Sequence, residues 1–206
     1  MRLILASASP RRRDLLARLG LPFEVRPSGV EETLDPGVPA PSLAMALARA
    51  KARDTADGLS VTGEGPALVL GADTLVVLDG RPVGKPATRE EAGEMLRALR
   101  GRRHEVVTAV VLLHVPGGRE LAETVTSQVF MRPYGDHEID TYVATGEPDD
   151  KAGAYAVQGA GRRLVTRVEG CYTNVVGLPL QTTARMLRTF GLAPRDPSGP
   201  PEASLG

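Results

Sequence analysis

The stretch of residues 104–132, HEVVTAVVLLHVPGGRELAETVTSQVFMR, decides the fold class. Two long β patterns, at 104–115 and 119–132, flank the turn residues Gly117 and Gly118, so they predict a hairpin of two long strands. Before this hairpin, strand-like and helix-like segments alternate along the chain. Alternation followed by a hairpin predicts an α/β protein, with a mixed sheet and helices around it.

The residues before the hairpin predict short strands and three helices. Ser9 is a plausible N-cap of the first helix, with Pro10 at its first position and Gly20 just past its end. Thr88 and Glu91 form a capping-box pattern at the start of the third helix. We expect strands at 2–6, 23–26, 67–72 and 75–78, a hairpin turn at 79–80, a loose polar segment at 60–66, and the second and third helices at 42–57 and 88–101.

After the hairpin, the patterns are shorter. Asp136 can cap a short helix that stops at Gly146, and we expect strands at 164–168 and 172–176 and a last helix at 179–190. Residues 194–206 are rich in Pro, Gly and Ser and are predicted to be a disordered tail. Residues 1–193 are therefore expected to form a single domain.

Composition argues against several classes of partner. The 25 basic and 25 acidic residues cancel, whereas nucleic-acid or membrane-surface binding usually leaves a basic excess. Cys171 is the only cysteine, which excludes an internal disulfide and favours a reducing, cytoplasmic location. The apolar stretch at 67–78 is interrupted by Asp73, so we expect no membrane segment.

The first candidate site is the sequence SASPRRR at 7–13, where a strand passes into a helix. A helix N-terminus carries partial positive charge, so consecutive arginines there conflict with the local field. A bound phosphate would resolve the conflict, because it accepts hydrogen bonds from the helix N–H groups and from an arginine fork. Ser9, Arg11 and Arg12 are the candidates for such a site; the alternative is that the arginines extend into water.

The second candidate is Asp73 in GADT at 71–74, because a carboxylate at the end of a buried strand needs a partner or a task. It could hold a metal, accept a proton from water, or both; the alternative is a turn or N-cap aspartate. The chain has only three lysines, Lys51, Lys85 and Lys151, which suggests that each stands where a compact ammonium is needed. For Lys51 the alternative is a solvated helix lysine.

The third candidate lies in the segment 146–159, which mixes carboxylates, a lysine and small residues. Its Gln158 offers both a donor and an acceptor, as reading the edge of a nucleobase requires.

Taken together, these motifs resemble the Maf family of septum-formation-inhibitor-like nucleoside triphosphate pyrophosphatases, from Leu3 to Phe190. The residues that carry the resemblance are SASPRR at 7–12, Glu31-Glu32, LARAK at 47–51, GADT at 71–74, GKP at 84–86, DKAGAY at 150–155 with Gln158-Gly159, and NVVGLP at 174–179.

The resemblance implies an elongated, twisted mixed sheet flanked by helices, with two lobes and a central cleft as in Maf and ITPase proteins, and a possible homodimer. It implies hydrolysis of a nucleoside triphosphate to the monophosphate and pyrophosphate with a divalent cation, Mg²⁺ or Mn²⁺. By position, Asp73 matches the family's proton acceptor. Glu32 and Asp73 together can hold the hard cation through their carboxylate oxygens. The positions tied to substrate choice are Arg11, Thr74 and Gln158, and those of the phosphate or metal site are Arg12, Glu32, Lys51 and Lys85.

Within the family, DKAGAY followed by Gln158-Gly159 resembles the branch that acts on dTTP and UTP, so we expect a preference for pyrimidine nucleotides, modified ones included. The alternative function is a nucleotide-binding regulator of cell division and septum formation that acts through a protein partner. The presence of Asp73 and Glu32 favours the enzyme.

Overall fold

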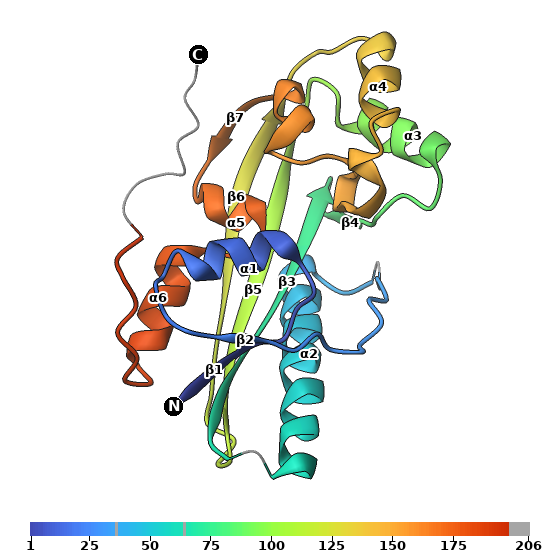
Figure 1. Cartoon of the computed structure of the whole chain (residues 1–206). Helices are drawn as coiled ribbons and strands as arrows, with labels where there is room; N and C mark the ends of the chain where they lie inside the picture. The colour runs from blue at the N-terminus through green and yellow to red at the C-terminus, as the bar shows by residue number, and fades with distance from the viewer. Residues whose placement is uncertain (36, 64, 198–206) are drawn as a thin grey trace.

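The computed structural model describes residues 1–35, 37–63 and 65–197 as one mixed seven-stranded sheet with helices on both faces (Figure 1). The strand order is β2-β1-β3-β5-β6-β7, with β4 beside β3. β1 pairs in parallel with β2 and β3, and every other pairing is antiparallel. The strands are β1 Arg2–Leu5, β2 Glu24–Val25, β3 Ala67–Leu78, β4 Arg81–Val83, β5 Arg103–Val115, β6 Glu120–Met131 and β7 Val165–Glu169. The predicted α/β class and the long hairpin are confirmed.

The helices lie in two groups along the long strands β3, β5 and β6, which gives the molecule its two lobes (Figure 1). They are α1 Pro10–Ala17, α2 Ala40–Thr62, α3 Arg89–Leu99, α4 Asp136–Val143, α5 Tyr172–Val176 and α6 Leu180–Arg188, with the short 3-10 helices η1 Glu147–Asp150, η2 Ala152–Ala154 and η3 Gly159–Leu164. One lobe contains α3, α4 and the 3-10 helices, and the other contains α1, α2 and α6.

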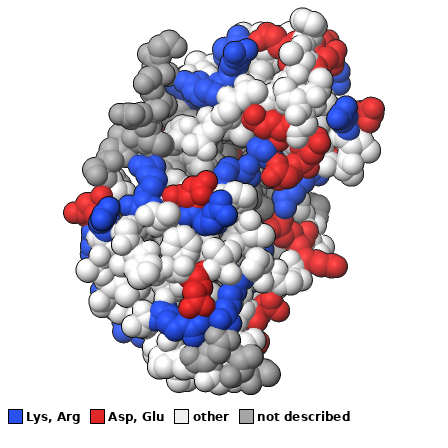
Figure 2. Space-filling model, viewed as in Figure 1, with Lys and Arg blue, Asp and Glu red and all other residues white. Residues whose placement is uncertain are grey.

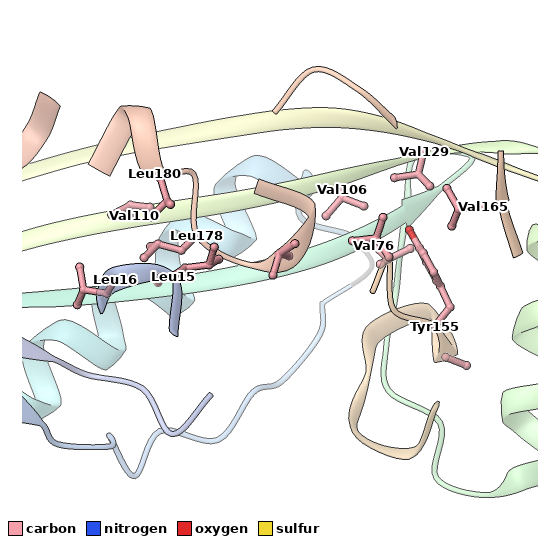
Figure 3. Packing of buried hydrophobic residues seen from close by; sticks show 14 of the residues in the cluster. Leu15, Leu16, Val76, Val106, Val110, Val129, Tyr155, Val165, Leu178 and Leu180 are labelled. Atoms are coloured by element: carbon pink, nitrogen blue, oxygen red, sulfur yellow. The ribbon is translucent and has the colours of Figure 1, made fainter. Parts of the chain in front are cut away.

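The two faces of the sheet bury separate hydrophobic clusters, because side chains alternate along β3. Leu70 and Val76 face the cluster that includes α1, α5 and α6, while Val69 and Leu75 face α2. Figure 3 shows the first cluster continuing along the strands, from Leu15, Leu16 and Leu178 at one end to Tyr155 and Val165 at the other. One continuous core therefore links the two lobes on that face.

Residues 67–78 form a single strand rather than the two that we expected. Asp73 and Thr74 stay in register with Ala109 and Thr108 of β5, so the polar pair does not interrupt the ladder. The loose segment expected at 60–66 was wrong for residues 60–62, because α2 continues to Thr62. The Ser60 hydroxyl donates to the Ala56 carbonyl within the helix, and Gly63 ends the helix in the left-handed conformation.

The strand expected at 172–176 is the helix α5, which is a correction with a tertiary cause. Its β-branched residues favour a strand locally. However, the buried side chain of Asn174 donates to the Val106 carbonyl and to the Ser127 hydroxyl, and these bonds fix a helical turn against β5 and β6.

Asp136 is the first residue of α4 and not its cap. The cap position is Gly135, whose N–H is satisfied by the Glu138 carboxylate at 3.0 Å. Of the predicted tail, residues 194–197 form neither helix nor strand, and residues 198–206 lie outside the described residues. None of the described helices has the length and apolar character needed to cross a bilayer.

Candidate active site

The candidate site is a cavity of about 400 Å³ at an interruption in the edge of the sheet. β1 pairs with residues 67–70 of β3, and β4 pairs with residues 76–78. Between these pairings, residues 71–75 have no strand partner on this edge within the described chain. The turn that leads from β1 into α1 lines the cavity beside this interruption, so groups from both faces of β3 can reach a common space.

Every site residue predicted from the sequence lines this one cavity, although the residues come from separate parts of the chain. They are Ser9, Arg11 and Arg12 from the start of α1, Glu32 from the loop before α2, Lys51 from α2, Asp73 and Thr74 from β3, Lys85 from the loop after β4, and Gln158 from the loop before η3. In the view of Figure 2, basic and acidic side chains lie next to one another around the hollow between the two lobes. The structure therefore brings the predicted residues together.

At the cavity's centre, two lysines and two carboxylates alternate. Lys51 Nζ donates to Asp73 Oδ1 at 2.6 Å and to Glu32 Oε1 at 2.5 Å. Lys85 Nζ donates to the other oxygen of Glu32, Oε2, at 2.6 Å. Lys51 and Asp73 are 6% and 3% exposed, which rules out the alternatives of a solvated helix lysine and of a turn aspartate.

The protein environment shifts the pKa values of the two carboxylates in opposite directions. Burial raises the pKa of Asp73, although Lys51 and Arg12 act against that rise. Burial would also raise the pKa of Glu32, but the hydrogen bonds and charges of Lys51 and Lys85 outweigh it and lower the value to about 2. Glu32 is therefore ionised at neutral pH, whereas Asp73 binds a proton more readily than an exposed aspartate does.

Arg12 points into the protein rather than into water. Its Nε donates to the Gly177 carbonyl at 3.0 Å, its Nη1 to Ser7 Oγ at 3.3 Å and its Nη2 to Thr74 Oγ1 at 3.0 Å. Burial lowers the pKa of Arg12, while Asp73 acts to raise it. The unfavourable position of an arginine at the positive N-terminus of α1 is thus partly offset by these three protein acceptors.

Thr74 continues this network across the sheet. Thr108 Oγ1 donates to the Asn174 carbonyl at 3.0 Å, so its one proton is committed and it accepts from Thr74 Oγ1 at 2.9 Å. The hydrogen bonds therefore run in one direction, from Arg12 through Thr74 and Thr108 to α5. They fix the side chains of Arg12 and Thr74, which both line the cavity.

The neighbouring arginines differ from Arg12. Arg13 is exposed and lies 3.4 Å from Asp14 at the surface. Arg11 lines the cavity, and its side chain makes no hydrogen bond or ion pair within the described residues, which leaves its guanidinium available to a ligand. Across the cavity, Lys151 Nζ donates to Asp150 Oδ1 and to the Glu147 carbonyl, each at 2.6 Å.

Sequence reasoning did not identify several residues that hold this site. Thr108, Ser7 and the Asn174 carbonyl support Arg12 and Thr74, and Glu147 binds the loop that carries Gln158. One signal was readable, since Thr108 is a polar residue inside the apolar run of β5. The others depend on which segments meet in space.

The carboxylates of the cavity are the candidate ligands for the expected divalent metal. Within residues 1–35, 37–63 and 65–197, no group of three or more His, Cys, Asp or Glu side chains is arranged to hold a metal ion. Glu32 and Asp73 nevertheless both contact the same Lys51 nitrogen, so their oxygens lie close together. Mg²⁺ often binds through one or two carboxylates together with substrate phosphates and water, and the carboxylates of Glu32 and Asp73 fit that mode of coordination.

Comparison with known proteins places this geometry in context. Residues 2–190 match the family model described as Maf-like protein. The chain is 50% identical over 191 residues to the dTTP/UTP pyrophosphatase of Moorella thermoacetica, with 93% of this chain and 96% of that protein covered. It is 51% identical over 192 residues to the protein of the same name from Anaeromyxobacter dehalogenans strain 2CP-1, with 92% and 94% covered.

Among solved structures, a nucleoside-triphosphatase, dITP/XTP pyrophosphatase, from Mycobacterium abscessus aligns over 94% of this chain and 97% of its own, with 17% sequence identity and a TM-score of 0.41.

Proposed function

Because the chain belongs to the Maf-like family, we propose that it hydrolyses nucleoside triphosphates, with dTTP and UTP as its preferred substrates, to the nucleoside monophosphate and pyrophosphate. This makes it a hydrolase of acid anhydrides that removes nucleotides from the cellular pool. The relatives described above carry the name of this activity. The alternative of a cell-division regulator has no observation in its favour.

The observation that carries the proposal is the convergence of opposite charges on one cavity. Arg11, Arg12, Lys51 and Lys85 bring cationic groups to its wall, while Glu32 and Asp73 bring carboxylates. A triphosphate carries close to four negative charges, and its hydrolysis needs the charge that develops on the leaving pyrophosphate to be stabilised. A cavity with cations alone would bind the triphosphate, but the carboxylates add groups that can act on water.

In the proposed reaction, a water oxygen forms a bond to the α-phosphorus while the bond from that phosphorus to the α–β bridging oxygen breaks. The electron pair of the broken bond leaves on pyrophosphate, and the proton of the attacking water passes to the Asp73 carboxylate. Lys51 holds Asp73 Oδ1, so it orients the acceptor. Arg11, Arg12 and Lys85 are placed to bind the phosphate oxygens.

We propose that Glu32 and Asp73 hold a divalent cation, Mg²⁺ or Mn²⁺, together with the substrate. Both carboxylates now bind Lys51, so a metal-loaded site requires this ammonium to share them or to move toward a phosphate. When bound, such a cation neutralises phosphate charge.

For base recognition we propose Gln158, with Arg11 and Thr74 contributing to substrate choice. Gln158 is exposed, lines the cavity and makes no capping hydrogen bond with its own side chain. Its amide can pair with both the carbonyl and the N–H of a uracil or thymine edge. Substituents on the pyrimidine away from that edge would be tolerated, so modified pyrimidine nucleotides are proposed substrates too.

We also propose that the protein acts in the cytoplasm as a homodimer, with no nucleic-acid or membrane partner. The equal numbers of acidic and basic residues and the single cysteine support this setting. Sedimentation equilibrium of the full chain tests the dimer, and a monomer mass at micromolar concentration would contradict it.

The test of the function is pyrophosphate release from a panel of common and methylated nucleoside triphosphates, with Mn²⁺, with Mg²⁺ and with excess EDTA. We expect equal amounts of monophosphate and pyrophosphate, the highest kcat/KM for dTTP and UTP, and no turnover in EDTA. Binding of UTP without turnover under every condition would favour the regulatory alternative, and release of inorganic phosphate would contradict the proposed bond cleavage.

A further inference from the structure

The loop that carries Gln158 is held by a carboxylate outside the charged centre. The backbone N–H groups of Ala160 and Gly161 donate to Glu147 Oε2 and Oε1, at 2.9 and 3.1 Å. Both N–H groups belong to the first turn of η3, immediately after Gln158. Glu147 therefore fixes the C-terminal side of this loop.

Tyr142 fixes the N-terminal side of the same loop. Its hydroxyl accepts from the Ala156 N–H at 3.2 Å and donates to Glu147 Oε1 at 3.0 Å. Tyr142 is buried on α4, so it is a rigid support. Glu147 and Tyr142 thus bind the backbone on both sides of Gln158.

Two glycines make this close approach possible. A Cβ added to Gly159 would lie 2.7 Å from Glu147 Oε2, and one added to Gly161 would lie 2.6 Å from the Tyr142 hydroxyl. Gly159 also has a φ of +65°, which side-chain-bearing residues rarely adopt. The sequence of the loop is therefore suited to a support that reaches it from α4 and η1.

Glu147 supplies the hydrogen-bond acceptor that a helix usually receives from its own N-cap residue. A Ser, Thr, Asp or Asn at the N-cap accepts from the N–H of the second or third helical residue. The N-cap of η3 is Gln158, and it makes no such bond. The Glu147 carboxylate accepts from both of those N–H groups instead, so the Gln158 amide remains free to line the cavity.

We propose that Glu147 is a positioning residue for nucleobase selection, because it caps η3 in place of Gln158 and holds Gln158 toward the substrate. This inference rests on the proposed role of Gln158 in reading the base. Without the carboxylate, the first turn of η3 loses its acceptors and the loop no longer presents Gln158 in one orientation.

The test compares Glu147→Gln, Gln158→Ala and the double variant with the wild type. In Glu147→Gln, one oxygen is replaced by an NH₂ group that faces a donor, so a charge-assisted bond is lost. We expect kcat/KM for UTP to fall roughly 10-fold, mainly through KM. The preference for UTP over ATP should fall with it, and Ala160 and Gly161 amides should exchange hydrogen faster.

In the Gln158→Ala background, Glu147→Gln should cause little further loss of selectivity, because both changes remove the same interaction. The matched control is Asp149→Asn, which removes the same charge from the same turn, η1, and should keep wild-type selectivity. Full additivity in the double variant, or a lower melting temperature with unchanged selectivity, would overturn the proposal.

If the wild-type protein hydrolyses no nucleotide, the proposed function fails but this inference is still tested. The same variants are then compared by the binding of the α,β-imido analogue of UTP and of ATP. Equal losses of UTP-analogue preference in Glu147→Gln and Gln158→Ala would support the positioning role, and loss in Gln158→Ala alone would contradict it.

Discussion

At Gly71 the backbone of α2 approaches β3 closely, and Gly71→Ala is expected to disturb both stability and the site. A Cβ at this position would lie 2.3 Å from the Ala48 carbonyl oxygen and 2.9 Å from the Ala52 nitrogen. Both are backbone atoms of α2, so neither can rotate away. The cost is therefore steric, and it is relieved only if the helix moves away from the strand.

The size of the effect follows from these distances. Ordinary contacts begin at 3.4 Å, so α2 must move by about 1 Å. Overpacking of this kind destabilises by about 1–3 kcal/mol. For a chain of this length, that lowers the melting temperature by about 2–12 °C. Lys51 lies on α2, and Asp73 lies on the same face of β3 as Gly71. A shift of α2 away from β3 would therefore separate Lys51 from Asp73, and kcat/KM should fall by about 10²-fold.

The assay is thermal unfolding together with steady-state pyrophosphate release from UTP, at a temperature where both proteins are folded. Gly58→Ala is the matched control, because it lies on the same helix and an added Cβ there meets nothing within 4 Å. It should be as stable as the wild type or slightly more stable. Wild-type melting temperature and turnover in Gly71→Ala would refute the account of how α2 and β3 position the site.

Three other changes test separate parts of the account. Asp73→Asn should lower kcat by at least about 10²-fold, as the loss of a general base does. The control Asp79→Asn lies outside this cavity and should keep the wild-type kcat. Unchanged turnover in Asp73→Asn would place the base elsewhere. Lys85→Ala should lower kcat/KM with little change in stability, since its ion pair with Glu32 is half exposed, and a wild-type ratio would place Lys85 outside the phosphate site. Burial lowers the pKa of His104 from its ordinary value of 6.5 to about 4 in the folded protein. Between pH 6.5 and about pH 4, the unfolded chain therefore binds more protons at His104 than the folded protein does. Stability should fall by up to about 3 kcal/mol as pH drops through this window, and urea unfolding of His104→Gln should lack this contribution; equal pH dependence in the two proteins would argue against it.

The fold was predictable where one pattern was long and regular. The two strands in the run at 104–132 were predicted almost to the residue, because apolar and β-branched side chains recur along both of them and the turn residues Gly117 and Gly118 separate them. Residues 172–176 misled because their helix depends on the buried bonds of Asn174 to β5 and β6, which no local pattern contains.

The site was predictable as a set of residues but not as a network. The motifs shared with the Maf family assigned Lys51, Glu32 and Asp73 to one site. The structure adds that the Lys51 ammonium joins the carboxylates of Glu32 and Asp73. The support from Glu147 was not predictable, since an exposed-looking glutamate in a polar turn gives no sign that two amides of η3 depend on it. Contacts between segments far apart in sequence account for this difference.

Hydrolysis of UTP in H₂¹⁸O tests the central claim most directly, because the position of the label reports which phosphorus water attacks. With water held beside Asp73 and pyrophosphate as the leaving group, one ¹⁸O atom should appear in the phosphate of uridine monophosphate and none in pyrophosphate. Label in pyrophosphate or in inorganic phosphate would contradict attack at the α-phosphorus.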